Sequence, residues 1–437
     1  MTDSVQVEEA EVHYVDIVGR LHALTIPYRK LSAREIYIDA SSVDMLDISN
    51  SDLLLKPDES TVAVLPWEPR KCRVLTSMWL GKERFWGDTR YAAERTENLV
   101  RSLGYEAMMG AEVEFFIHRV KYFVNGGKQY VSVHQEEMFP SGIYPPKGMY
   151  QALDMWGPAY SVREKATQYL KFMGVEATKQ HHEVAPNQAE IVTPSGGPLS
   201  VGDYVTTIKY VVKKAASELG YIANFMPKPL SDDNGSGMHV HVSLWINSSN
   251  VFWDEEGELS QVGRYFVGGI LEHGKSIAAL VASTTNSYKR LVPGYEAPVY
   301  LAWGYANRSV AVRVPKTQKP SGSRVEFRVP DPLSNPYLAL SAILLAGLDG
   351  VRKKIDPGDP LRRNAYKLSP NEIKELGIET LPRNLWEAIE HLETDNDYLR
   401  PAFPAELIEK YIELKKKEVL SVESIPTPAE YAHYLSW

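Results

Sequence analysis

The 437-residue chain contains a single cysteine, Cys72, which excludes an internal disulfide framework and fits a reducing compartment. It lacks long apolar runs, and the longest one, at residues 342–346, is far too short to span a bilayer. The formal net charge is -8 and no block of lysine and arginine occurs, which argues against binding to nucleic acid or to a membrane surface. The polar, acidic first residues do not resemble a signal peptide. We therefore expect a cytoplasmic protein.

The chain also lacks internal repeats and low-complexity segments, and its composition of 44% hydrophobic and 24% charged residues is typical of globular proteins. Its length exceeds that of one typical domain, so two domains are predicted. Short strands are expected over residues 13–64, and an amphipathic helix over 90–103 ends at Gly104. The predicted domains are residues 1–104 and 105–437. Loops are predicted in the second domain at Gly126, Pro145 and Gly196.

A glycine-rich loop that leads into an alternating strand is the most informative stretch, at residues 233–244. Because side chains alternate across a strand, His239, His241 and Ser243 share one face, opposite an apolar face. Gly235 and Gly237 carry no side chain that would keep a ligand away from the backbone. A half-exposed strand whose histidines contact only water explains this stretch equally well, so its interpretation depends on the rest of the chain.

Carboxylates gather in two further segments. A strand at residues 110–117 places Glu112 and Glu114 on one face, where they repel each other unless water or a cation intervenes; a solvated edge strand is the alternative. Glu183 and Glu190 follow at loop spacing. Pro186 excludes a His-Glu-x-x-His zinc helix there, because it stands where that helix would continue.

A P-loop pattern occurs at residues 269–276, where Gly269 is followed by Gly274, Lys275 and Ser276. A functional P-loop requires a hydrophobic strand before the glycines and a helix that starts at the lysine. Here apolar residues continue through the pattern at helical spacing. We therefore predict a packing helix and expect no phosphate at Lys275.

Arginines occur at alternating positions in residues 307–315 and 323–330, with valine and phenylalanine on the opposite face of the second segment. A surface salt-bridge ladder would explain one such strand. In a chain of negative net charge, however, their concentration indicates a bound polyanion, since guanidinium groups suit phosphate and carboxylate. The loop at 286–298 contains Arg290 and Glu296 beside turn residues and is typical of loops that close over substrates.

Five carboxylates and one imidazole on these segments favour a hard divalent ion, Mg²⁺ or Mn²⁺ rather than zinc, and allow more than one ion. The six candidate ligands are Glu112, Glu114, Glu183, Glu190, Glu326 and His239. Divalent metals beside several arginines are typical of phosphoryl transfer. The spacing alone therefore predicts a metal-dependent enzyme that uses ATP without a P-loop.

Several blocks, in order along nearly the whole chain, resemble the class I glutamine synthetase family. They are Glu112-Val-Glu-Phe-Phe, His182-Glu-Val-Ala-Pro, Met226-Pro-Lys-Pro-Leu, Asn234-Gly-Ser-Gly-Met-His-Val-His, residues 286–298, Asn307-Arg-Ser and Arg324-Val-Glu-Phe-Arg-Val-Pro-Asp-Pro. The resemblance implies an α+β fold, in which an N-terminal β-grasp domain precedes a larger catalytic domain with an antiparallel sheet and flanking helices. It also implies a dodecamer of two hexameric rings with active sites between neighbouring subunits.

The same resemblance implies ATP-dependent ligation of ammonium to glutamate through γ-glutamyl phosphate. One metal is expected at Glu114, Glu183 and Glu190, and the other, beside the phosphates, at Glu112, His239 and Glu326. Glutamate is expected at Asn234, Gly235, Arg290, Arg328 and Ser42, and ATP at His241, Ser243, Arg313 and Arg324. The residues expected to act in catalysis are Arg308, which helps to stabilise the transferred phosphoryl group, Arg328, Glu296 on the closing loop, and Asp39 of an adjacent subunit, which binds ammonium and helps to deprotonate it.

Four residues depart from the family pattern, namely Ala40, Asn187, Ser195 and Ser321. Ala40 stands beside the expected ammonium site, which keeps a γ-glutamyl-amine or γ-glutamyl-polyamine ligase as the alternative function. A non-catalytic assembly protein of the same fold is disfavoured, because it has no use for converging carboxylates. Tyr366 lies where some family members are adenylylated, but its surroundings resemble unmodified members and we expect no modification.

Overall fold

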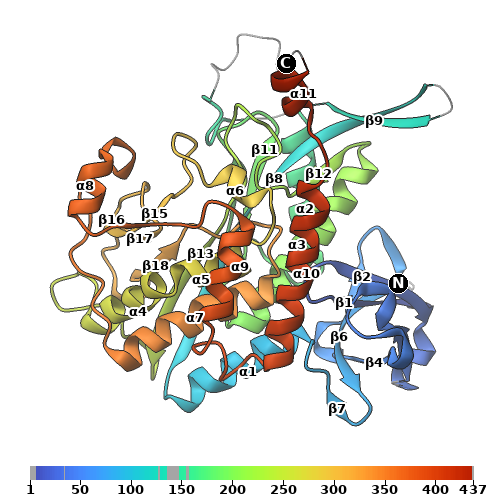
Figure 1. Ribbon diagram of the computed structural model, residues 1–437. Helices are drawn as coiled ribbons and strands as arrows, with labels where there is room; N and C mark the ends of the chain where they lie inside the picture. The colour runs from blue at the N-terminus through green and yellow to red at the C-terminus, as the bar shows by residue number, and fades with distance from the viewer. Residues whose placement is uncertain (1–5, 34, 126–127, 135–146, 154–156, 436–437) are drawn as a thin grey trace.

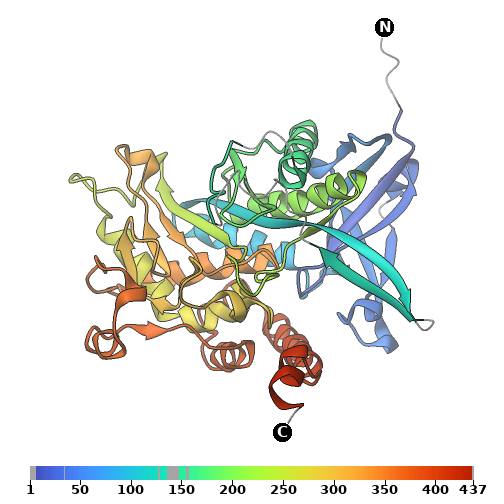
Figure 2. The same cartoon turned by 90° about the horizontal axis from the view of Figure 1, so that it is seen from above.

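The computed structural model describes residues 6–33, 35–125, 128–134, 147–153 and 157–435. A β-rich N-terminal part and a larger part of strands and helices make up the molecule, as the predicted α+β class requires (Figure 1). The two parts lie side by side, with the N-terminal sheet and α4 at opposite ends (Figure 2). The loops predicted at Gly126 and Pro145 lie outside the described residues, whereas Gly196 lies between β11 and α3.

The N-terminal part is built on a seven-stranded sheet of order β2-β1-β6-β4-β3, with β5 and β7 also paired to β6. Its strands are β1 (Glu9–Val15), β2 (Leu21–Pro27), β3 (Ile36–Asp39), β4 (Asp52–Pro57), β5 (Ala63–Leu65), β6 (Glu68–Leu80) and β7 (Glu83–Arg84). Alternate residues such as Val12 and Val74 are fully buried beneath this sheet. Four short 3-10 helices connect the strands, at Tyr28–Ala33, Ala40–Val43, Ile48–Asn50 and Glu59–Thr61.

The larger part contains a ten-stranded sheet of order β10-β11-β8-β13-β18-β17-β16, with β9, β12 and β14 paired beside that path. Its strands are β8 (Glu106–Asn125), β9 (Lys128–His134), β10 (Lys179–His182), β11 (Gln188–Val192), β12 (Ile222–Asn224), β13 (Met238–Ile246), β14 (Ser249–Asn250), β16 (Trp303–Tyr305), β17 (Val312–Val314) and β18 (Val325–Phe327). A separate pair is formed by β15 (Tyr300–Leu301) and β19 (Glu379–Thr380).

The described part of the chain contains eleven α-helices. They are α1 (Thr89–Ser102), α2 (Pro158–Phe172), α3 (Pro198–Glu218), α4 (Gln261–Glu272), α5 (Gly274–Val281), α6 (Ser287–Arg290), α7 (Pro336–Lys353), α8 (Pro370–Glu375), α9 (Leu385–Thr394), α10 (Ala405–Glu423) and α11 (Pro428–Tyr434). Further 3-10 turns occur at Pro320–Gly322 and Ala365–Lys367. Helix α1 packs against α3 and α7; the division of the chain near residue 104 stays a prediction. Within the described ranges, no helix is long and apolar enough to cross a membrane.

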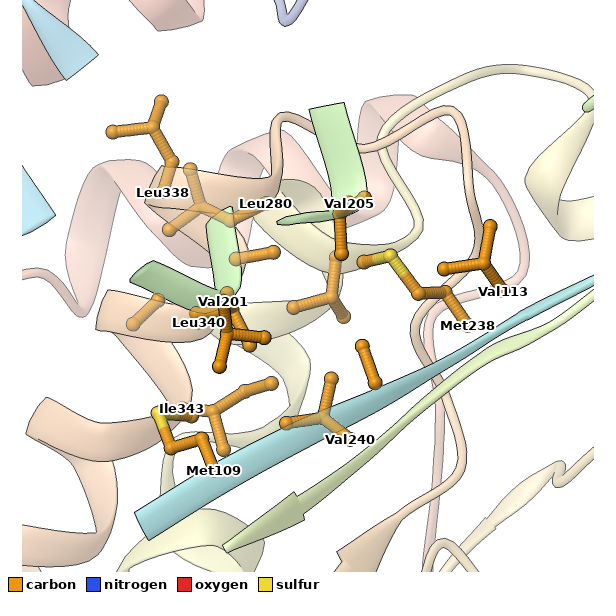
Figure 3. Packing of buried hydrophobic residues seen from close by; sticks show 14 of the residues in the cluster. Met109, Val113, Val201, Val205, Met238, Val240, Leu280, Leu338, Leu340 and Ile343 are labelled. Atoms are coloured by element: carbon orange, nitrogen blue, oxygen red, sulfur yellow. The ribbon is translucent and has the colours of Figure 1, made fainter. Parts of the chain in front are cut away.

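The core of the larger part lies between the sheet and the helices α3, α5 and α7 (Figure 3). Met109 and Val113 of β8 and Val240 of β13 face these helices and are at most 1% exposed. Because side chains alternate along β8 and β13, the apolar packing on one face turns the neighbouring polar side chains to the other face. The packed core thus determines which face of the sheet carries glutamate and histidine.

The P-loop pattern lies within two helices, which confirms that it is not a P-loop. Helix α4 ends at Glu272 and α5 begins at Gly274, so the segment breaks at His273 rather than forming the single helix expected. Gly269 is a close-packing position, since a Cβ there would lie 2.0 Å from the Ala346 carbonyl oxygen. The Lys275 ammonium lies 3.2 Å from a Glu379 carboxylate oxygen.

Candidate active site

Three adjacent strands bring one row of acidic and histidine side chains together. His181 on β10 lies opposite Glu190 on β11, and Glu190 lies opposite Glu114 on β8. The Nε2 atom of His181 is 3.0 Å from Glu190 Oε1, and its Nδ1 atom is 3.4 Å from Glu183 Oε1. His181, Glu183 and Glu190 are buried and offer ligand atoms within 4.8 Å of one another. The expected ligand Glu114 is their neighbour across the sheet, whereas His181 was not predicted.

A second row lies two residues further along the same strands and centres on Glu112. Its two carboxylate oxygens lie 3.1 Å from His239 Nδ1 and 3.0 Å from His241 Nε2. Arg324 Nε donates a hydrogen bond of 3.2 Å to His241 Nδ1, so in this arrangement the proton of the neutral imidazole is on Nε2 and points at Glu112. Glu112, His241 and Glu326 form a second group with ligand atoms within 4.8 Å.

Glu326 on β18 is fully buried between two arginines. Its carboxylate accepts a 2.7 Å hydrogen bond from Arg328 and a second bond from Arg313. Strand register places it opposite His241 on one side and Arg313 on the other. Burial would raise the pKa of Glu326, but the charge of Arg328, followed by the nearby histidines, lowers the pKa to about 2. This carboxylate is therefore ionised at neutral pH.

The pKa values of the other carboxylates depend on their burial, on neighbouring charges and on hydrogen bonds. Burial, and then the charge of Glu190, raises the pKa of Glu114 to about 8. Burial and the charge of Glu114 likewise raise the pKa of Glu183. At Glu112 the hydrogen bonds from the two histidines outweigh the effect of burial and lower the pKa. Carboxylates that hold protons because they are buried and repel one another have the donor chemistry of a divalent cation site, since the cation replaces those protons.

Glycine is required in the loop before β13. A Cβ on Gly235 would lie 2.2 Å from the Pro227 carbonyl oxygen, and one on Gly237 would lie 2.6 Å from Arg290 Nη2. Asn234 at the start of this loop donates through Nδ2 to Glu296 at 3.4 Å. Arg290 Nη1 and Nη2 donate to the backbone carbonyls of Val329 (2.8 Å) and Arg328 (3.0 Å). Arg290 on α6 therefore holds the segment after β18 in position, and Asn234 joins the loop to Glu296.

These side chains surround a cavity of about 190 Å³. Predicted site residues in its lining are Glu112, Glu114, Glu183, Glu190, Asn234, Gly235, His239, His241, Arg290, Glu296, Arg308, Arg313, Arg324 and Arg328. A neighbouring cavity of about 300 Å³ contains Ser243, Ser195, Ser321 and Trp245 in its lining. The two cavities share four lining residues, namely Glu112, Lys179, His241 and Arg324. The structure thus places a highly polar space beside a second one whose lining contains the indole of Trp245 as well as Ser195.

Asp39 and Ser42 do not line either cavity of their own chain. They lie at an exposed 3-10 turn of the N-terminal part, where the Asp39 carboxylate accepts hydrogen bonds from the hydroxyls of Ser41 (2.6 Å) and Ser42 (2.8 Å). These hydrogen bonds, that of Ser41 first, lower the pKa of Asp39. Ala40 is fully buried and its φ is not positive, so its methyl group imposes no left-handed strain on the turn.

Asn187 and Gln188 lie where the turn after Glu183 leads into β11. Asn187 has φ +58°, a conformation that asparagine tolerates better than most residues, which explains how it replaces a glycine. Gln188, which spacing did not single out, donates to Glu114 (3.2 Å) and to the Gly235 carbonyl (3.0 Å). The adjacent histidines before Glu183 were the signal that could have identified His181, since it alternates with Glu183 on an extended segment.

Comparison with known proteins agrees with this geometry. The "Glutamine synthetase, beta-Grasp domain" family model matches residues 6–80, and the "Glutamine synthetase, catalytic domain" model matches residues 86–434. The chain is 40% identical to a glutamine synthetase of Sulfolobus acidocaldarius, with 99% of this chain and 96% of that protein covered. It is 39% identical to one of Thermotoga maritima, with 98% of each covered.

Solved structures give the same result for the fold. A structure described as a GmaS/ADP complex superposes with a TM-score of 0.86 at 27% identity, covering 100% of both chains. A cryo-EM structure of Plasmodium falciparum glutamine synthetase also gives 0.86 at 27% identity, covering 98% of this chain and 96% of the other. Over nearly its whole length, then, the chain belongs to the glutamine synthetase family.

Proposed function

We propose that this protein joins ammonium to the γ-carboxyl group of glutamate, with ATP consumed and glutamine, ADP and phosphate released. The supporting observation is that one cavity is lined by five of the six candidate metal ligands and by five arginines, while the sixth ligand, Glu326, is buried and paired with Arg313 and Arg328 of that lining. In the first step the γ-carboxylate oxygen attacks the γ-phosphorus of ATP, which forms γ-glutamyl phosphate and releases ADP. In the second step ammonium loses a proton, the resulting ammonia attacks the acyl carbon, phosphate leaves, and the nitrogen loses a second proton.

The charged side chains suit the first step. Mg²⁺ or Mn²⁺, two or more per site, would be held by Glu114, Glu183 and Glu190 and by Glu112, His239 and Glu326, and would supply positive charge to the phosphates. Arg308, Arg313 and Arg328 line the same cavity and would neutralise charge on the transferred phosphoryl group. Burial, followed by the charge of Arg328, lowers the pKa of His239, which keeps its ring neutral and able to act as a ligand.

The two cavities suit the two larger substrates. Glutamate would bind at Asn234, Gly235, Arg290 and Arg328, which line the first cavity and whose guanidinium groups match its carboxylates. ATP would place its phosphates near His241, Arg313 and Arg324 and extend past Ser243 in the second cavity. Glu296, at φ +59° on an exposed turn, would cover the glutamate site.

Ammonium requires a carboxylate that is charged and accessible. Asp39 meets both conditions, since hydrogen bonds from neighbouring serines lower its pKa and the residue is exposed. Because Asp39 and Ser42 lie outside the cavities of their own chain, they would serve the site of a neighbouring subunit, and Ser42 would reach the bound substrate there. A ring assembly, with twelve subunits in two hexamers, would provide that neighbour.

An acceptor panel tests this function against the γ-glutamyl-amine ligase alternative. Purified protein receives glutamate, ATP and Mg²⁺ or Mn²⁺ with ammonium, putrescine, spermidine or another small amine, and products are identified by mass spectrometry. We expect glutamine to predominate, because the serines beside Asp39 offer no apolar wall for a long amine. Glutamine as the minor product would reassign the acceptor, and absence of any ATP turnover would indicate a non-catalytic assembly protein.

The role of Asp39 has a matched control within the same domain. Asp47 is also exposed and caps a short 3-10 turn, and its carboxylate accepts from Ser49 N (2.9 Å) and Ser49 Oγ (2.6 Å). Asp39→Asn should raise the ammonium concentration needed for half-maximal rate at least tenfold, whereas Asp47→Asn should leave it unchanged. Equal effects of the two substitutions would contradict an ammonium site at Asp39.

A further inference from the structure

Lys179 places a positive charge between the two groups of candidate metal ligands. Its ammonium nitrogen lies 3.2 Å from Glu190 Oε1 and 3.9 Å from Glu112 Oε1. Glu190 belongs to the group with His181 and Glu183, and Glu112 belongs to the group with His241 and Glu326. The ammonium is therefore bound by one carboxylate from each group.

Strand register explains this position. Lys179 is the first residue of β10 and lies opposite Val192 on β11, which lies opposite Glu112 on β8. Two residues further, His181 occupies the row of Glu190. The backbone thus holds the start of the lysine side chain beside both carboxylates, while that side chain remains 47% exposed and free to change its direction.

Lys179 also lines both cavities, and within the described part of the chain no other lysine lines either of them. Along with Arg324, it supplies the positive charge at the junction where one cavity opens toward the other. A divalent ion bound at Glu190 or Glu112 would repel the ammonium at this distance. The side chain would then need another anionic partner, and the polyphosphate of a nucleotide in the second cavity provides one.

We propose that Lys179 exchanges partners during the catalytic cycle. It pairs with Glu190 and Glu112 in the empty site and with the nucleotide polyphosphate once divalent ions occupy the carboxylates. This inference rests on the proposed function, since it requires a metal and a nucleotide in these two cavities. Its consequence is positive coupling between nucleotide and metal. Bound nucleotide draws the Lys179 ammonium away from the carboxylates for which it competes with the metal, and bound metal releases that ammonium to contact the nucleotide.

Binding measurements on Lys179→Gln, which keeps a similar side-chain length without the charge, test this coupling. Free Mn²⁺ is quantified by EPR during titration with and without ADP, and ADP binding is measured by calorimetry at saturating Mn²⁺. Without ADP, the variant should bind Mn²⁺ severalfold more tightly than the wild type. With Mn²⁺ present, it should bind ADP about tenfold more weakly, the loss expected for one charge-assisted contact.

Two further variants make the result specific. Lys179→Arg retains the charge and should retain most of the coupling. Lys171→Gln removes a lysine charge from α2 that is 74% exposed and 3.7 Å from Glu176, and it should behave as the wild type. Unchanged or weaker Mn²⁺ affinity in Lys179→Gln, or unchanged ADP affinity, would overturn the inference. Failure of the wild type itself to bind Mn²⁺ and ADP would instead contradict the proposed function.

Discussion

Replacement of Glu326 with alanine tests the site and the energetics of its buried charges together. The carboxylate is fully buried and compensates Arg328 at 2.7 Å as well as Arg313. Removing one partner of a buried ion pair costs about 3–5 kcal/mol, because the charge left behind has lost its compensation. Since domains are stable by roughly 5–15 kcal/mol, the variant should fold but unfold at a clearly lower denaturant concentration. The apolar face of β18, with Val325 and Phe327, is unaffected.

The effect on catalysis should be larger than the effect on stability. Loss of Glu326 from the proposed metal ligands Glu112, His239 and Glu326 should lower glutamate-dependent ADP release by at least about a thousandfold, which corresponds to roughly 4 kcal/mol of transition-state stabilisation. Activity is measured with saturating Mn²⁺, and stability is measured by urea unfolding of the same preparation. Glu379→Ala is the matched control, because its carboxylate is 63% exposed and pairs with Lys275 on the surface, where an ion pair contributes about 0–1 kcal/mol.

Two results would refute this reasoning separately. Retained glutamate-dependent ADP release in Glu326→Ala would exclude this carboxylate as a metal ligand. An unfolding midpoint equal to that of Glu379→Ala would show that Arg313 and Arg328 do not depend on Glu326 for charge compensation. Glu326→Gln tests the charge apart from the packing, since it keeps the side-chain volume and one of the two acceptor oxygens but removes the charge that both the arginines and a cation need.

Three other predictions follow from individual contacts. Lys275→Ala should keep its activity within about twofold of the wild type, because Lys275 lies on α5 and pairs with Glu379. A loss of two or more orders of magnitude, roughly 3 kcal/mol of transition-state stabilisation, would restore the P-loop interpretation. Mn²⁺ affinity should rise with pH by up to about tenfold per unit below pH 8, because the ion must displace the proton that burial and Glu190 hold on Glu114; EPR titrations should show a flatter profile for Glu114→Gln. Tyr366 should carry no adenylyl group in mass spectra of natively expressed protein, because its hydroxyl donates a 2.8 Å hydrogen bond to the Ala297 carbonyl and is not free for modification.

Alternation along strands predicted which side chains share a face. In β13, His239 and His241 face the cavity whereas Val240 packs against the helices, as the sequence pattern indicated. The same holds for β18, where Val325 and Phe327 are fully buried in the core. The start of α7 was also predictable, since the Asn335 side chain accepts hydrogen bonds from the amides of the first turn and Pro336 needs no partner for its nitrogen. These features depend on residues close together in the chain.

The grouping of ligands could not be predicted in this way, because it depends on pairing between distant strands. The family resemblance placed Glu114 with Glu183 and Glu190, and that assignment stays a prediction; the structure adds His181, which offers a ligand atom within 4.8 Å of those of Glu183 and Glu190. Likewise, it adds His241, which offers a ligand atom within 4.8 Å of those of Glu112 and Glu326. His239 and His241 both lie within reach of Glu112, at 3.1 Å and 3.0 Å, so a bound cation would select between them by its preferred geometry.

The position of the Lys179 ammonium also depends on pairing between strands and could not be predicted from residue spacing. The sequence shows an isolated lysine before two histidines, which gives no reason to place it near Glu112, some sixty-seven positions earlier. The placement follows from the register of β10 against β11, and a shift of one residue would turn Lys179 and His181 to the apolar face together. Because the ammonium and the imidazole depend on the same short strand, an insertion of one residue in the 183–187 turn should weaken metal and nucleotide binding together, whereas Lys179→Gln should strengthen metal binding and weaken nucleotide binding.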